Sequence, residues 1–278
     1  MSPTVGSLVS AAMQRLQGSD SPRLDAELLL ADVLGCGRAA LYRDPDRTVE
    51  EALAARFDAL VAARGEGRPV AYLLGHAEFW SLRLAVNPAV LVPRPETELL
   101  VEIALASCAP RRRPTVADLG TGSGAIACAF AHERPDALVI ATDRSAAAVA
   151  VARSNAEGLG LTAVRTLVAD WLEPFADASL DAVLANPPYI GTTESATLDA
   201  GLAFEPRAAL FAGSDGLAAL ACIIPAARRV LRAGGFLVLE HGHEQGPAVR
   251  EMCRCHGFGD CTSTRDLAGH ERVTRAAG

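Results

Sequence analysis

The sequence has no long hydrophobic run, no excess of basic charge and no regularly spaced cysteines, and each absence excludes a class of protein. The longest apolar candidate, Leu217 to Ile224, ends at Pro225 and is much shorter than the roughly 18 residues of a membrane-spanning helix. A formal net charge of −7 argues against a protein that holds long nucleic acid through phosphate contacts alone, because such proteins are usually basic. We therefore expect neither membrane association nor stable binding of nucleic acid.

The start of the chain carries neither the basic region nor the long apolar region of a secretion signal. The seven cysteines are odd in number and scattered, which does not fit a disulfide framework. We therefore expect a cytoplasmic protein. With 278 residues, half of them hydrophobic, the chain can form one large domain and one small domain.

Residues 1–72 have helical periodicity and no strand pattern, which predicts a small N-terminal helical bundle. Ser21-Pro22 has the residues of a helix start, and Thr48 with Glu51 matches a capping box for a later helix. No cluster of ionisable residues in this region suggests chemistry, so we expect it to dock a partner. Residues 73–94 follow as a hinge and β-hairpin linker, because their apolar residues alternate and Asn87-Pro88 breaks the run.

From residue 95 to 278 strands and helices alternate, which predicts an α/β domain with a doubly wound sheet. Four expected strands end on a polar or acidic residue: Asp118, Asp143, Asp170 and Asn186. Ligands of open α/β sheets bind at the carboxyl ends of the strands, where the strand order reverses. We therefore expect these side chains to converge on one crevice.

The glycine-rich turn from Leu119 to Gly124 is compatible with two cofactors. Gly120, Gly122 and Ala125 satisfy the G-x-G-x-x-A pattern of dinucleotide-binding folds. Asp143 lies 19 residues beyond Gly124, close to the spacing of a ribose-binding acid in those folds. A nicotinamide-dependent dehydrogenase is therefore one interpretation.

Three acidic positions favour S-adenosylmethionine over the nicotinamide cofactor. The carboxylate of Asp118 precedes the turn, where a pyrophosphate would fit poorly but the ammonium group of an amino-acid tail would fit well. Asp143 would then accept both ribose hydroxyls, and Asp170-Trp171 would hold the adenine. No pair of residues after Asn186 has the pattern of a hydride-transfer site.

The tetrapeptide Asn186-Pro187-Pro188-Tyr189 closes an apolar run and predicts a substrate site made of acceptors. The two prolines end the strand and remove two donors, so the carbonyls of Asn186 and Pro187 face outward beside the asparagine side chain. Such acceptors suit a planar NH2 group, either a carboxamide or an adenine amino group, and Tyr189 offers a flat face. For this motif alone, a rigid turn at a strand end is an equally good interpretation.

Several polar segments elsewhere fit simpler roles. In Pro93-Arg-Pro-Glu-Thr-Glu98, Glu98 fits a helix start, whereas Arg94 and Glu96 lie where the hairpin meets the catalytic domain and are candidates for substrate binding. Cys253-Arg-Cys255-His256 fits zinc spacing poorly, so we expect free thiols and no metal site. Glu240-His-Gly-His243 is expected to be a turn after a core strand, and its histidines could act as bases only if they reach the crevice.

Short segments spread over nearly the whole chain match one enzyme family. They are Ala77-Glu-Phe-Trp80, Val86-Asn-Pro88, Pro93-Arg-Pro-Glu-Thr-Glu98, Asp118-Leu-Gly-Thr-Gly-Ser-Gly124, Ala141-Thr-Asp143, Asp170-Trp171, Asn186-Pro-Pro-Tyr-Ile190, Glu205-Pro-Arg207, Leu210-Phe211, Gly216-Leu217 and Asp266-Leu-Ala-Gly269. With these segments the chain resembles the release-factor glutamine N5-methyltransferases of the HemK/PrmC type, which are class I S-adenosylmethionine-dependent methyltransferases.

The resemblance implies a fold, a reaction and a set of site residues. It implies a Rossmann-like, seven-stranded methyltransferase domain behind a helical domain that docks the release factor. The methyl group would pass to N5 of the Gln in the Gly-Gly-Gln motif, with S-adenosyl-L-homocysteine as the product. By this resemblance, the cofactor contacts are Gly120, Thr121, Gly122, Ser123, Gly124, Asp143, Trp171 and Asn186, and the contacts of the target Gln are Asn186, Pro187, Pro188 and Tyr189.

Catalysis of amide methylation would depend mainly on how the substrate amide is positioned relative to the methyl group. The Asn186 side-chain oxygen and the Pro187 carbonyl would each accept one amide hydrogen and turn the nitrogen lone pair toward the methyl group. Adenine N6-methyltransferases of nucleic acid share the tetrapeptide but should carry a basic recognition domain, which the sequence lacks. Two further hypotheses are a glutamine methyltransferase that acts on a ribosomal protein and a cofactor-binding scaffold without catalysis. We expect a monomer.

Overall fold

The computed structural model describes residues 3–193 and 200–278, and the chain divides into two compact units. The described residues up to His76, together with η3 (Ala200–Phe204), form the first unit. The second unit begins at Ala77 and includes the remaining described residues. None of the helices in the described ranges is long and apolar enough to cross a membrane.

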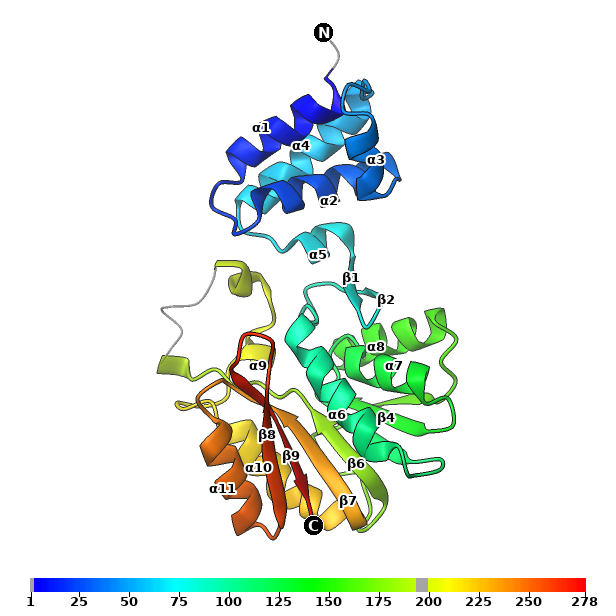
Figure 1. Cartoon of the computed structure of the whole chain (residues 1–278), viewed down its shortest axis with the longest axis vertical. Coiled ribbons are helices and arrows are strands. Elements are labelled where there is room, and N and C mark those ends of the chain that lie inside the picture. Colours follow the sequence, from blue (N-terminus) through cyan, green and yellow to red (C-terminus); the bar gives the residue numbers. More distant parts are fainter. Residues whose placement is uncertain (1–2, 194–199) are drawn as a thin grey trace. The chain divides into compact units, whose positions relative to one another are not determined.

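The first unit is helical, as its periodicity predicts (Figure 1). Its elements are α1 (Val5–Arg15), α2 (Pro22–Leu34), α3 (Arg38–Arg43), α4 (Glu51–Gly65) and α5 (Val70–Leu74). Their apolar faces meet in one core, in which Leu29, Leu30 and Phe57 are among the most buried side chains. Burial of these faces, rather than helix propensity, stabilises such short helices.

The expected capping box of Thr48 and Glu51 is wrong. Helix α4 has Glu50 as its N-cap, and that residue makes no side-chain cap bond. Thr48 instead pairs with Thr4 in a short antiparallel bridge, which holds the chain extended two residues before the N-cap. The reciprocal box forms at Thr4 and Ser7, at the start of α1.

The helical unit also contains a cluster of ionisable groups that no sequence pattern indicated. The buried carboxylate of Glu27 accepts hydrogen bonds from Arg23 Nε (2.8 Å), Arg38 Nη2 (2.7 Å) and the Tyr42 hydroxyl. Burial by itself would raise the pKa of Glu27, but these hydrogen bonds outweigh it and lower the pKa to about 2. Because its oxygens are already bonded, this carboxylate ties α2 to α3 and is a structural group.

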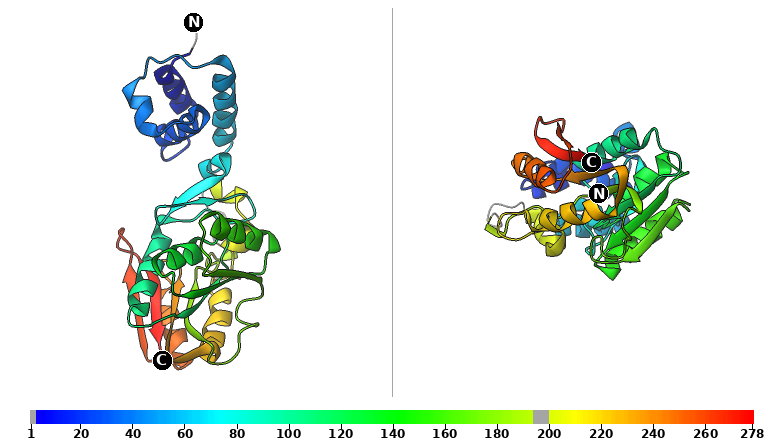
Figure 2. Two further views of the ribbon diagram at one scale, coloured as in Figure 1. Left: turned by 90° about the vertical axis from the view of Figure 1, so that its right-hand side faces the viewer. Right: turned by 90° about the horizontal axis from the view of Figure 1, so that it is seen from below.

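The second unit is built on a seven-stranded sheet, which confirms the expected α/β class (Figures 1 and 2). Its strands are β3 (Thr115–Leu119), β4 (Leu138–Asp143), β5 (Val164–Val168), β6 (Leu180–Ala185), β7 (Leu231–Glu240), β8 (Asp260–Arg265) and β9 (Glu271–Ala277). The strand order is β5-β4-β3-β6-β7-β9-β8, and β9 runs antiparallel to both of its neighbours. The other pairs, including β3 with β4 and with β6, are parallel.

Helices cover both faces of this sheet, because alternate residues of each central strand are apolar on opposite faces. On β3, Val116 packs into one core cluster with residues of α6 and α7, whereas Ala117 and Leu119 pack into the other with residues of α10 and α11. The helices and short turns of this unit are η1 (Pro95–Thr97), α6 (Glu98–Cys108), α7 (Ala125–Glu133), α8 (Ala146–Gly158), α9 (Arg207–Leu210), α10 (Ala218–Val230) and α11 (Gly246–Cys255). Strand order reverses at β3, which lies between β4 and β6.

The expected turn at Asn87-Pro88 is wrong, because residues 86–92 form no strand. The linker instead contains an earlier hairpin of β1 (His76–Phe79) and β2 (Leu82–Ala85), which turns at Trp80-Ser81. The buried side chain of Asn155, on α8, joins it to the glycine-rich turn. Asn155 Nδ2 donates to the carbonyls of Ala85 (3.0 Å) and Ser123 (2.8 Å), and its Oδ1 accepts from the Ala85 amide (2.7 Å). One side chain therefore fixes both the end of β2 and the turn that follows β3.

Candidate active site

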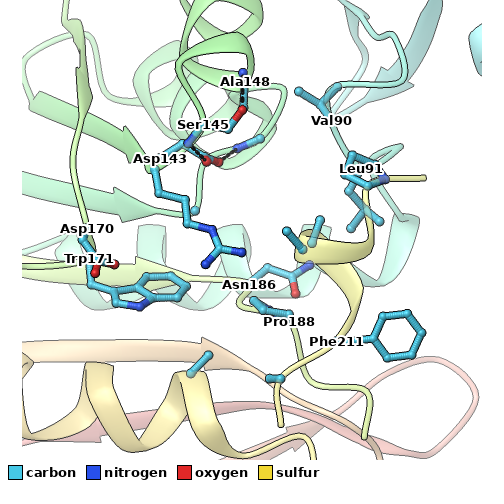
Figure 3. A pocket seen from close by; sticks show the side chains of 18 of the residues that line it. Val90, Leu91, Asp143, Ser145, Ala148, Asp170, Trp171, Asn186, Pro188 and Phe211 are labelled. Atoms are coloured by element: carbon cyan, nitrogen blue, oxygen red, sulfur yellow. Dashed lines mark hydrogen bonds between the residues drawn. The ribbon is translucent and has the colours of Figure 1, made fainter. Parts of the chain in front are cut away.

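A cavity of about 380 Å³ opens at the carboxyl ends of β3, β4, β5 and β6, where the strand-end residues predict a crevice. Figure 3 shows Asp143, Trp171 and Asn186, which follow or end three different strands, facing a common space. Residues 89–91 and the segment 206–222 provide the other walls. Of the predicted site residues, the following line the cavity: Gly120, Gly122, Asp143, Asp170, Trp171, Asn186 and Pro188.

The glycine-rich turn keeps its backbone close to neighbouring groups. Gly120 has φ +64°, and a Cβ at this position would lie 3.4 Å from the ring of Trp171. Gly124 has φ +82°, and a Cβ there would lie 3.1 Å from Cα and Cβ of Ala152 on α8. The left-handed backbone and this close packing explain why glycine is needed at these two positions.

Asp118 lies outside the cavity lining and is fully buried. Its Oδ2 accepts from the Thr121 hydroxyl (2.5 Å) and from the Ala127 amide (3.2 Å), so it fastens the turn to α7. Its Oδ1 has no hydrogen-bond partner within the described residues. Burial raises the pKa of Asp118 to about 7, against the opposing effect of these two hydrogen bonds.

Asp143 has a carboxylate that is held by backbone amides and still faces the cavity. Its Oδ2 accepts from the Gly122 amide (3.1 Å) and its Oδ1 from the Ser145 amide (2.8 Å). Each carboxylate oxygen can accept a further hydrogen bond, so two neighbouring hydroxyl groups of a ligand would find acceptors here. Trp171, half-buried with φ +39°, offers an indole face within the same cavity (Figure 3).

The side chain of Asn186 is oriented by a hydrogen bond. Asn186 Nδ2 donates to the hydroxyl of Thr97 (3.1 Å), which belongs to η1 and is buried. Its amide oxygen is therefore the part of the side chain left for a ligand. Pro188 also lines the cavity, whereas Pro187 and Tyr189 lie outside its lining.

Tyr189 is held on the far side of the tetrapeptide by Gln245, a residue that no sequence motif singled out. The Tyr189 carbonyl accepts from Gln245 Nε2 (3.0 Å), and the Gln245 Oε1 accepts from the Gly242 amide (2.9 Å). Gly216 approaches so closely that a Cβ would lie 2.1 Å from the Tyr189 carbonyl oxygen. Burial, followed by the nearby charge of Glu240, raises the pKa of the Tyr189 hydroxyl to about 12.

Arg94 and Glu96 occupy different surroundings from those expected of a pair of substrate residues. Arg94 forms an ion pair with Glu205, which is buried and also accepts from the Val92 amide (3.2 Å). This pairing fastens the segment before η1 to the segment before α9, so that both walls of the cavity are joined. Glu96 is exposed on η1. Neither residue lines the cavity, and their roles in substrate binding stay predictions.

The Glu240-His-Gly-His243 segment does follow a core strand, but it is more than a turn. Glu240 is buried at the end of β7, next to β6, which Asn186 directly follows. His241 is buried with Nε2 2.8 Å from the Thr274 hydroxyl, and burial lowers its pKa, whereas His243 lies on the surface. Neither histidine lines the cavity. The rule that polar residues at parallel strand ends converge would have found Glu240 as well.

Comparisons with known proteins show which family the chain resembles over nearly its whole length. Residues 7–75 match the PrmC N-terminal domain and residues 96–208 match the Methyltransferase small domain. The chain is 46% identical to the release factor glutamine methyltransferase of Salmonella typhimurium over 95% of each chain, and 46% identical to that of Pseudomonas aeruginosa over 94% of each. Identity to the Escherichia coli protein of the same name is 43%, again over 95% of each chain.

Among solved structures, the chain is similar to the hMettl16 catalytic domain in complex with the MAT2A 3'UTR hairpin 6. The TM-score is 0.58, the sequence identity is 16%, and 84% of each chain is covered. At this identity the likeness shows the fold alone.

Proposed function

This chain belongs to the family of release factor glutamine methyltransferases, and from that membership we propose that its cavity binds S-adenosylmethionine while Asn186 and Pro187 hold the amide of a release-factor glutamine. It is an S-adenosylmethionine-dependent protein-glutamine methyltransferase. The product of the reaction is a glutamine methylated at N5, and we expect the enzyme to work as a cytoplasmic monomer.

The residues of the cavity fit the proposed cofactor. The two amide-bound oxygens of Asp143 suit vicinal ribose hydroxyls, and the indole of Trp171 suits a flat adenine. The unpartnered Oδ1 of Asp118 lies beneath the glycine-rich turn and would be satisfied by the cationic amino group of the tail, directly or through water. When bound, S-adenosylmethionine supplies an activated methyl group on a sulfonium centre.

The observation that carries the proposal is the orientation of Asn186. Because Nδ2 is committed to Thr97, Oδ1 is the atom available to accept a hydrogen from a substrate NH2 group. The neighbouring Pro187 provides a carbonyl and no backbone donor. In the proposal, these two acceptors meet one NH2 group, which they suit, and they would repel a group that has only acceptors.

An amide nitrogen is a poor nucleophile, since its lone pair is delocalised into the carbonyl. Two fixed acceptors favour the positive charge that develops on nitrogen during transfer, and they turn the lone pair toward the methyl group. After transfer the nitrogen carries a surplus proton, which an N-protonated amide gives up readily to water, so a strong base is not required for this step. The chain therefore contributes placement and electrostatic stabilisation rather than proton abstraction.

The test is to locate the methyl group after incubation with labelled S-adenosylmethionine. A full-length release factor with an intact Gly-Gly-Gln loop should gain one methyl group on that glutamine, as found by peptide mass spectrometry. A release factor with the glutamine replaced by glutamate serves as the control and should gain none. Methylation of a ribosomal protein glutamine or of adenine in nucleic acid, without methylation of the release factor, would overturn the proposed substrate.

A further inference from the structure

Glu240 lies directly beside the proposed catalytic asparagine. In the parallel pair of β6 and β7, Ala185 is in register with Leu239, so Asn186, which follows β6, lies beside Glu240, the last residue of β7. The side chain of Glu240 is almost entirely buried, at 2% exposure. A buried carboxyl group at this position is unfavourable for folding unless its neighbours compensate for the lost water.

Asn186, Thr97 and Glu240 form one group of polar side chains. Asn186 Nδ2 donates to the Thr97 hydroxyl oxygen, and a hydroxyl group carries a single hydrogen of its own to donate. Thr97 and Asn186 both lower the pKa of the neighbouring Glu240 carboxyl through hydrogen bonding, against the larger rise that burial causes. If the Thr97 hydrogen goes to this carboxyl, donation runs in one direction only, from Asn186 through Thr97 to Glu240.

That direction decides which way the Asn186 amide points. If the amide were turned over, its oxygen would face the Thr97 oxygen and the Glu240 carboxyl, and acceptors would meet acceptors. The carboxyl therefore keeps Nδ2 inside and Oδ1 toward the cavity. Placement of Oδ1 is the property on which the proposed methyl transfer depends.

A purely structural ion pair does not account for Glu240. Within the described residues no basic side chain lies within ion-pair distance of it, and its Oε2 has no hydrogen-bond partner. The groups that act on it from neighbouring elements are Arg272 on β9, which lowers its pKa, and Glu96 on η1, which raises it; Tyr189 also feels its charge. Arg272 is itself paired with Asp266 (3.1 Å).

We infer that Glu240 is a positioning residue for methyl transfer: through Thr97 it fixes the Asn186 amide so that Oδ1 receives the target NH2 group. The inference rests on the proposed function and deepens it. Glu240 touches neither cofactor nor substrate, and its effect passes through Asn186. An ionised Glu240 also strengthens the donation from Asn186 and makes Oδ1 a better acceptor.

The test compares two replacements of similar size, Glu240→Gln and Glu240→Met. The amide oxygen of Gln can still accept from Thr97, whereas Met cannot. We expect Glu240→Met to lose on the order of 100-fold in kcat, the loss associated with a misplaced catalytic group, with little change in the dissociation constant of S-adenosylmethionine. Glu240→Gln should keep kcat within a few-fold of the wild-type value. Equal losses in both variants, or none in Glu240→Met, would refute the inference.

A second pair keeps the test decisive if Glu240→Met does not fold. Thr97→Val removes the hydroxyl and keeps the shape, while Thr97→Ser keeps the hydroxyl. Loss of kcat in Thr97→Val and its retention in Thr97→Ser would support the hydrogen-bonded chain, and the opposite pattern would overturn it. The kcat of the wild type should also rise with pH near neutrality, and this rise should be smaller in Glu240→Gln, in which Asp118 still has a raised pKa.

A readout that needs no substrate separates the inference from the proposed function. In the full chain, the side-chain NH2 signal of Asn186 can be assigned in an amide NMR spectrum by its loss in Asn186→Asp. Its hydrogen exchange should be slow in the wild type and in Glu240→Gln, and at least tenfold faster in Glu240→Met. If the wild type methylates no release factor but this pattern holds, the proposed function fails while the positioning role of Glu240 stands. Equal exchange in all three proteins would end the positioning role.

Discussion

Replacing Gly216 with alanine should displace the tetrapeptide Asn186-Pro187-Pro188-Tyr189 and lower turnover, although Gly216 is not part of it. Gly216 has φ +75°, and its added Cβ would lie 2.1 Å from the Tyr189 carbonyl oxygen and 2.7 Å from Gln245 Nε2. Atoms this close cannot coexist, so the Tyr189 carbonyl has to move by about 1 Å and its hydrogen bond with Gln245 has to break. The carbonyl belongs to the same rigid Pro-Pro-Tyr segment as the acceptors of the proposed substrate site.

The size of the effect follows from that displacement. A shift of about 1 Å in a catalytic group reduces turnover by roughly 100-fold, which corresponds to about 2.7 kcal/mol of transition-state stabilisation. The left-handed backbone adds strain of about 1–2 kcal/mol to an alanine, and this strain lowers the free energy of unfolding. We therefore expect Gly216→Ala to have a lower kcat, a somewhat lower Tm and nearly unchanged affinity for S-adenosylmethionine.

The matched control is Gly158→Ala. Gly158 ends helix α8, and an added Cβ would have no heavy atom within 4 Å. This replacement should keep full activity and raise the free energy of unfolding by up to about 1 kcal/mol. Kinetics of release-factor methylation, isothermal titration with S-adenosylmethionine and thermal unfolding measure the three quantities. A Gly216→Ala protein with wild-type kcat would refute the reasoning.

Three further predictions concern the same region. Asn186→Ala should lower kcat at least about 100-fold while cofactor binding is partly retained, and full activity in Asn186→Asp, which keeps an acceptor but adds a charge, would contradict the acceptor geometry. Burial raises the pKa of Asp118 and Glu240 from near 4 to about 7, so their contribution to stability is complete below pH 4 and is lost as the pH rises through 7. Urea unfolding of the free enzyme should therefore give a lower free energy at pH 8 than at pH 5, by up to about 3 kcal/mol per group, with a smaller difference in Glu240→Gln; an increase would contradict the assignment. Cys222 is an exposed free thiol that lines the cavity, so S-adenosylhomocysteine should slow its alkylation by iodoacetamide, as followed by peptide mass spectrometry, and an unchanged rate at Cys222 would argue against the cavity as the cofactor site.

The sequence predicted the class of fold because its patterns are local. Helical periodicity in the first unit and alternation in the linker follow from side chains a few residues apart. The helices are present, and the linker contains a hairpin, but its turn lies at Trp80-Ser81 and not at Asn87-Pro88. The strand-end rule brought Asp143, Trp171 and Asn186 to one cavity from positions spread over more than 40 residues.

Features that depend on contacts between distant residues were missed. The Glu27 cluster joins side chains that are 11 and 15 residues away, and no periodic pattern marks them. Thr48 has a capping sequence but is held by pairing with Thr4, because a tertiary contact overrides a local preference. No local sequence pattern marks Gln245. Its role follows only from its hydrogen bond to the Tyr189 carbonyl, a contact between residues far apart in the sequence.

The ion pair between Arg94 and Glu205 has a consequence for the synthesis of the enzyme. The two walls that it joins come from residues 89–91 and 206–222, so a growing chain cannot complete the proposed methyl-donor site until residue 222 has left the ribosome. We therefore expect the nascent enzyme to be inactive for most of its own translation. Methylation of release factors, which end translation, can begin only when synthesis of their modifying enzyme is itself close to termination.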